Sequence, residues 1–188
     1  MKIGLDIMGG DYAPKAAVLG AIAAHKTLAA GQQLVLIGDR DIAESLLAEN
    51  NYSADHFGFV HTTEVIGMGE HPTKAIVQKP DSSISVGFSM LKEGQIDAFA
   101  SAGNTGGMLV GAMFSVKTIP GVMRPAMTTI VPKQQGGLGI LLDVGANADC
   151  KAEALVQFGV LGSLFARSVY HIENPKVALM NIGEDEEK

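Results

Sequence analysis

Short apolar runs and longer amphipathic stretches alternate along this chain. The apolar runs at 2–7, 34–37, 57–61 and 96–100 have the length of buried strands. The stretches after Pro14, at 82–93, after Gly103 and at 152–170 are long enough for helices. Alternation of this kind is typical of a parallel sheet covered on both faces. We therefore predict an α/β fold: a three-layer α/β/α sandwich with a mainly parallel, Rossmann-like sheet.

The second half of the chain continues with three further predicted strands, at 128–131, 140–143 and 176–181. The pair Gly136-Gly137 marks a tight connection between the first two of them. The chain contains no repeat, low-complexity tract or linker, so residues 1–188 are predicted to form a single α/β domain.

Local signals predict where some of the helices begin and end. Asp41 and Glu44 have the spacing of a capping box, and Asp81 is placed to cap the helix at 82–93 that Gly94 ends. Between them, residues 62–80 show no clear period, which predicts a long loop that moves or binds something.

The turn after the predicted strand at 96–100 is the main candidate site. Gly103, Asn104, Thr105 and Gly106 lie between that strand and an apolar helical stretch. The first N–H groups of a helix lack intrahelical partners, and the helix dipole adds positive potential, so such a turn can bind phosphate. The same residues also suit a plain turn with glycine for backbone geometry and Asn or Thr as a cap, and both interpretations stand.

Three other turns have a similar sequence pattern. In each, an apolar strand is followed by glycine together with Asn or acidic residues. Ligands of open parallel sheets gather at the carboxyl ends of the strands, so we expect all four turns to lie on one edge of one sheet. The candidates in these three turns are Asp6, Gly9, Gly10 and Asp11; Asp143, Asn147 and Asp149; and Asn181, Glu184 and Lys188.

Several of these residues have a second interpretation. Asp6 and Asp11 can stabilise a turn or cap a helix, and they can also form a paired-carboxylate site. Asn147 and Asp149 can order their loop or cap a helix that starts near residue 151. Arg124 suits contact with an anion and equally an ion pair at the rim of a site.

Charge and cysteine content narrow the function classes. The chain has 14 basic and 20 acidic residues and a net charge of −6, which argues against nucleic acid as its main partner. A small phosphate ion needs only local positive potential, so the net negative charge does not exclude phosphate as a ligand. A single cysteine excludes an intramolecular disulfide and indicates a reducing cytoplasm. No apolar run approaches the ~20 residues of a membrane span.

Other catalytic chemistries have little support in the sequence. The five histidines show no metal-ligand spacing, and neither an HExxH motif nor a Walker A lysine motif is present. We therefore predict no metal and no cofactor. Cys150 near a helix start suits an acyl-enzyme nucleophile, but the interpretation as a structural cysteine is preferred.

The motifs together resemble the PlsX phosphate acyltransferases of bacterial phospholipid synthesis. The resemblance runs over essentially the whole chain, through segments 5–11, 79–83, 101–106, 124–126, 142–147 and 181–184. It implies a cytoplasmic homodimer, loosely associated with the membrane, with a fold akin to the phosphotransacetylases. It also implies transfer of a long-chain fatty acyl group from acyl carrier protein to inorganic phosphate, giving acyl phosphate.

The resemblance sharpens the roles of individual residues. Gly103 to Gly106 become the phosphate cradle, and Asn104, Asn181 and Lys188 the candidates that hold phosphate or the oxyanion. Family members are longer, so the chain is expected to be an N-terminal portion that is inactive by itself. At Gln78-Lys79-Pro80 members often have a more basic stretch, so no docking role is carried over to Lys79.

Two alternatives stay open beside this interpretation. One is a short-chain phosphotransacetylase that uses coenzyme A, and the other is a non-catalytic fragment that only binds phosphate.

Overall fold

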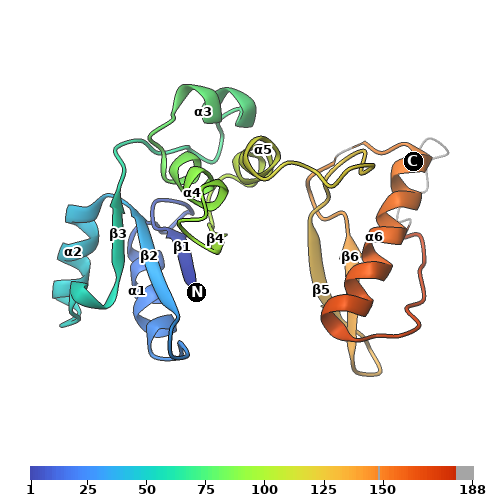
Figure 1. Ribbon diagram of the computed structural model, residues 1–188, viewed down its shortest axis with the longest axis horizontal. Coiled ribbons are helices and arrows are strands. Elements are labelled where there is room, and N and C mark those ends of the chain that lie inside the picture. Colours follow the sequence, from blue (N-terminus) through green and yellow to red (C-terminus); the bar gives the residue numbers. More distant parts are fainter. Residues whose placement is uncertain (148, 181–188) are drawn as a thin grey trace. The chain divides into compact units, whose positions relative to one another are not determined.

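The computed structural model describes residues 1–147 and 149–180. The chain divides into two compact units, Met1–Lys117 and Thr118–Lys188, which are described separately below (Figure 1). Two compact units can belong to one domain, so the single-domain organisation stays a prediction.

The first unit contains a parallel sheet of four strands in the order β3-β2-β1-β4. Its strands are β1 (Lys2–Asp6), β2 (Gln33–Gly38), β3 (Gly58–His61) and β4 (Ala98–Ala100). Its helices are α1 (Lys15–His25), α2 (Arg40–Glu49), the 3-10 turn η1 (Ala54–His56), α3 (Pro72–Gln78), α4 (Ser83–Lys92) and α5 (Thr105–Ser115).

Helices cover both faces of this sheet, which confirms the α/β/α sandwich (Figure 1). Leu34 and Leu36 of β2 point to the face covered by α1 and α2, where they join the largest buried cluster. Val35 and Ile37 alternate to the opposite face and pack against α4. A strand that is buried on both faces has a continuous apolar sequence, which is why the sequence predicts a strand such as β2 well.

The strand order places a topological switch point beside β1. The chain first builds β2 and β3 on one side of β1 and then crosses to β4 on the other side. The carboxyl ends of β1 and β4 are therefore neighbours from which the chain leaves in different directions. In open α/β sheets, ligands bind in the crevice at this position.

The second unit consists of an antiparallel pair, β5 (Thr128–Pro132) and β6 (Leu138–Leu142), with α6 (Ala152–Tyr170) packed on β6 (Figure 1). Gly136 and Gly137 have φ angles of +85° and +86°, a conformation that only glycine adopts easily, and they form the predicted tight connection. The helix predicted at 152–170 is confirmed at both ends.

The predicted strand at 176–181 is wrong as far as it is described, because residues 176–180 form no strand. Val177 and Leu179 are 63% and 76% exposed, and no described strand pairs with this segment. An apolar run becomes a strand only where a neighbouring backbone satisfies its N–H and C=O groups.

The predicted caps are wrong by one or two residues. Asp39 caps α2, accepting from the N–H groups of Asp41 and Ile42, while Glu44 pairs with Arg40 at 2.6 Å. Ser82, and not Asp81, caps α4. Both helices begin near several polar residues that could each act as the N-cap. Which of them does so depends on where packing makes the helix begin.

The segment at 62–80, predicted to be a loop, contains the short helix α3. Pro72 at the first turn of α3 is the start signal that the sequence reading missed. Among the described residues, no helix is both long enough and apolar enough to cross a membrane.

Candidate functional site

Asp6 joins the turns that follow β1 and β4. Its side chain is 1% exposed, and one carboxylate oxygen accepts from the N–H groups of Met8 at 2.8 Å and Gly9 at 3.1 Å. The other oxygen accepts from the Ser101 hydroxyl at 2.6 Å, and that hydroxyl oxygen accepts from the N–H of Gly103 at 2.9 Å. The carboxylate thus holds both turns in one geometry, which supports the interpretation of Asp6 as a turn residue.

The two turns also touch through their backbones. A Cβ atom built on Gly9 would lie 2.6 Å from the N atom and 2.7 Å from the Cα atom of Gly103. Gly10 has a φ of +104° and packs against Ala102. Asp11 is exposed beside them. The turns after β1 and β4 therefore meet at the end of the sheet, as expected for these two of the four turns.

Asn104 caps α5 and ties the candidate cradle to a distant loop. Its Oδ1 accepts from the N–H of Gly107 at 2.8 Å. Its Nδ2 donates to the carbonyl oxygens of Gly67 at 2.9 Å, Met68 at 3.2 Å and Glu70 at 3.1 Å. The side chain is 4% exposed, so its polar atoms are engaged inside the protein. Asn104 is therefore placed to position the cradle.

The first turn of α5 keeps donors for a ligand. Among the described residues, no atom accepts from the N–H groups of Thr105 and Gly106. Thr105 is exposed, and its hydroxyl has no hydrogen-bond partner within the described part of the chain. Two N–H groups, one hydroxyl and the positive end of the helix dipole lie together at this turn, an arrangement of a kind that can bind an anion, and the phosphate cradle stays a prediction.

The segment that carries α3 packs over this turn, and sequence reasoning missed its role. Pro72 lies against Gly106, where an added Cβ atom would come within 3.0 Å of the proline Cβ. The ion pair between Glu70 and Lys79 at 2.5 Å braces the segment. The hydrogen bond from Lys79 lowers the pKa of the Glu70 carboxyl below its usual value. The ammonium of Lys79 is therefore engaged in this segment.

Asp143 organises the turn after β6 in the second unit. Its carboxylate accepts from the N–H groups of Met127 at 2.6 Å, Asn147 at 2.7 Å and Ala146 at 2.9 Å. Partial burial acts to raise the pKa of Asp143, but the N–H donors, with Met127 first, outweigh it and lower the pKa below the usual range. The carboxylate thus stabilises this turn in its ionised form.

The lowered pKa of Asp143 gives a pH-dependent prediction. The ionised form contributes stability above the ordinary aspartate value of 3.8, and this contribution is lost as the pH falls through the lower folded-state value. At pH 7, Asp143→Asn should cost roughly 1–2 kcal/mol, because charge-assisted hydrogen bonds are lost. Urea unfolding followed between pH 6 and pH 2.5 should show a smaller acid loss in the variant. Parallel acid losses in the two proteins would contradict the assignment.

The remaining residues of this turn do not cap α6. Asn147 donates from Nδ2 to the carbonyl oxygen of Pro125 at 2.9 Å, and the N-cap residue Lys151 makes no side-chain cap bond. Asn147 therefore orders the loop. Cys150 is half-buried and carries a free thiol.

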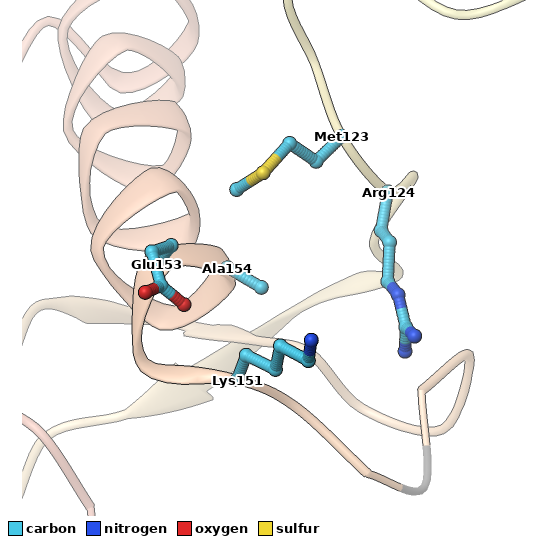
Figure 2. A pocket seen from close by; sticks show the side chains of 5 residues that line it. All are labelled: Met123, Arg124, Lys151, Glu153 and Ala154. Atoms are coloured by element: carbon cyan, nitrogen blue, oxygen red, sulfur yellow. The ribbon is translucent and has the colours of Figure 1, made fainter.

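A cavity of about 240 Å³ lies in the second unit beside this turn. Met123, Arg124, Lys151, Glu153 and Ala154 line it (Figure 2). Arg124 donates from its guanidinium to the backbone carbonyl oxygen of Asp149 at 2.8 Å.

The expectation that all four turns share one sheet edge is wrong. The turns after β1 and β4 do meet, but the turn after β6 belongs to the antiparallel pair, which is a different sheet. Local patterns show where a strand ends and do not show which sheet it joins. Asn181, Glu184 and Lys188 lie outside the described residues. Among the described residues, no group of three His, Cys, Asp or Glu side chains is placed to hold a metal ion.

Two solved phosphotransacetylase structures have a fold similar to that of this chain. The chain matches a phosphotransacetylase from Streptococcus pyogenes with a TM-score of 0.68 and 16% identity, over 89% of this chain and 54% of that one. It matches the EutD phosphotransacetylase from Staphylococcus aureus with a TM-score of 0.59 and 17% identity, over 88% of this chain and 52% of that one. The fold is therefore of the α/β phosphotransacetylase type.

Sequence comparison identifies the family. A family model described as "Fatty acid synthesis protein" matches residues 1–188, and the chain belongs to this family. Curated relatives named phosphate acyltransferase, from Dictyoglomus turgidum and Clostridioides difficile, are each 43% identical over all 188 residues. The chain spans about 55% of the length of both.

Proposed function

We propose that this chain is part of an enzyme that transfers a long-chain fatty acyl group from acyl carrier protein to inorganic phosphate. The product is an acyl phosphate for phospholipid synthesis. The observation that carries the proposal is the turn at the start of α5, which keeps two N–H donors and the Thr105 hydroxyl available at the switch point of the sheet. The family and the name shared by the curated relatives support it.

The geometry suggests what each residue contributes to this reaction. The N–H groups of Thr105 and Gly106 and the Thr105 hydroxyl hold phosphate, while Asp6 and Asn104 keep the turn rigid as positioning residues. A phosphate oxygen attacks the thioester carbonyl carbon, the C–S bond breaks, and the carrier thiolate leaves and takes up a proton. Lys188 and Asn181, which lie outside the described residues, remain our candidates for stabilising the oxyanion.

The reaction requires little from the protein beyond binding and orientation. Phosphate is already a nucleophile at neutral pH, so we propose no nucleotide, metal or redox cofactor. Holding the two reactants together can contribute ~7–11 kcal/mol to the lowering of the barrier. We also propose a homodimer in the cytoplasm with peripheral membrane contact and no nucleic-acid partner.

The test is hydroxylamine trapping of acyl phosphate by the natural-length protein, supplied with long-chain acyl carrier protein and inorganic phosphate. We expect trapped product and released carrier thiol in equal amounts. Thr105→Val should raise the KM for phosphate about tenfold by removing one hydrogen bond to a charged ligand, and Thr105→Ser should restore it. Cys150→Ser should keep most activity, because the thiol takes no part in the proposed step.

The opposite results have distinct meanings. Turnover only with acetyl coenzyme A favours the short-chain phosphotransacetylase, and phosphate binding without turnover favours a binding module. An unchanged KM in Thr105→Val removes Thr105 from the phosphate site. Complete loss of activity in a folded Cys150→Ser protein points to an acyl-cysteine intermediate.

A further inference from the structure

The cavity in the second unit brings together two cationic side chains from separate segments. Arg124 precedes β5, and Lys151 precedes α6. Figure 2 shows the ammonium of Lys151 directed toward the side of the cavity on which the guanidinium of Arg124 lies. Among the described residues, neither group has a carboxylate oxygen within ion-pair distance. Two like charges beside one cavity repel each other and are stabilised by an anion between them.

The cavity walls define what kind of anion fits. Met123 and Ala154 add an apolar surface to the lining, and Glu153 adds one carboxylate. The two cations and this carboxylate together leave a single positive charge to neutralise. The volume of about 240 Å³ is below the ~300–1,000 Å³ of common ligand pockets, so one anionic group with a short attached chain fits better than a whole substrate.

We propose that this cavity binds the phosphodiester of the pantetheine arm that carries the acyl group, which rests on the proposed function. A phosphodiester has one negative charge, which matches the charge of the cavity. Free phosphate is a mixture of monoanion and dianion at neutral pH, so its mean negative charge is larger than that of a phosphodiester and Glu153 repels it more strongly. Arginine and lysine are the usual partners of phosphate oxygens, and the adjoining chain of the arm lies against Met123 and Ala154.

The experiment measures binding of the methyl ester of 4′-phosphopantetheine, a phosphodiester, to the natural-length protein by calorimetry at low salt. We expect Arg124→Gln and Lys151→Gln each to weaken binding about tenfold. Glu153→Gln should tighten binding severalfold, because it removes a repelling charge. Lys133→Gln, which removes one charge in the β5–β6 hairpin away from the cavity, is the matched control and should change little. Pantetheine without phosphate should bind weakly and equally to all variants.

The proposal is overturned if the wild-type protein does not bind the ester. It is also overturned if Arg124→Gln and Lys151→Gln lose no more affinity than Lys133→Gln, or if Glu153→Gln weakens binding. Inorganic phosphate is the second probe: Thr105→Val should weaken its binding, and Lys151→Gln should not. Tighter binding of inorganic phosphate than of the ester at this cavity would assign it to the free ion and contradict the proposal.

The experiments distinguish failure of the cavity proposal from failure of the proposed function. If acyl phosphate is not trapped while the Arg124 and Lys151 variants still lose the ester, the proposed reaction fails and the cavity remains an ester site. If acyl phosphate is trapped while these variants bind the ester normally, only the cavity assignment fails.

Discussion

Asn104→Ala is expected to lower the free energy of unfolding by about 2–4 kcal/mol. Loss of a helix N-cap costs about 1 kcal/mol, and leaving buried polar groups without partners costs about 1–3 kcal/mol more. Here the Oδ1 cap of α5 is lost together with the Nδ2 donor shared by three carbonyl oxygens at 67, 68 and 70. The side chain is 4% exposed, so water does not replace it easily.

Two variants separate the cap from the loop contact. Asp39→Ala removes the side-chain cap of α2, which within the described part of the chain accepts only from N–H groups of its own helix, and should cost about 1 kcal/mol. Asn104→Ser keeps an acceptor for the cap but removes the amide donor, so it should fall between the two alanine variants. The measurement is urea unfolding, with limited proteolysis at 67–70 as a local readout. A cost for Asn104→Ala no larger than that for Asp39→Ala would contradict the double role.

The same variant should impair the proposed cradle. The loop at 67–70 is held to the first turn of α5 through Asn104, and releasing it allows the N–H groups of Thr105 and Gly106 to change direction. Weaker phosphate binding in Asn104→Ala together with normal binding in Asp39→Ala is the expected result, because the second variant is destabilised without touching the cradle.

The sequence predicted the strands of the first unit well, because each is a short, mostly apolar run bounded by turn residues. It also predicted the strand–turn–helix geometry around 103–106, since glycine and asparagine at a strand end are local signals, while anion binding at this turn stays a prediction. The antiparallel pairing of β5 and β6 was missed although the Gly136-Gly137 turn between two short strands is a hairpin signal. The expectation of one shared sheet edge therefore extended a rule for parallel strands to a strand that is antiparallel.

The role of the Asn104 side chain was not accessible from the sequence. Its amide contacts carbonyl groups 34 to 37 residues earlier in the chain, and no local pattern connects the two segments. The Asp6–Ser101 hydrogen bond joins residues 95 positions apart and likewise has no local signal in the sequence. Such contacts depend on how the strands are ordered in the sheet, and this order is set by packing.

Gly9→Ala is expected to have the second large effect. The added methyl group would lie 2.6 Å from the N atom and 2.7 Å from the Cα atom of Gly103, and backbone atoms cannot rotate away. The turns after β1 and β4 must then move apart, which strains the Asp6–Ser101 hydrogen bond. Overpacking of this kind costs typically 1–3 kcal/mol, and a shift of about 1 Å at a reacting centre can reduce the rate about 100-fold.

Gly20→Ala is the matched control, because the same methyl group is added in a helix where nothing lies within 4 Å. It should raise the free energy of unfolding by about 0.5–1 kcal/mol, since alanine favours the helix over glycine. We therefore expect opposite signs for one chemical change, measured by urea unfolding, and a large loss of acyl phosphate formation only in Gly9→Ala. Normal activity and stability in Gly9→Ala would mean that the two turns can separate freely, and the close approach of the β1 and β4 turns would then have no part in forming the site.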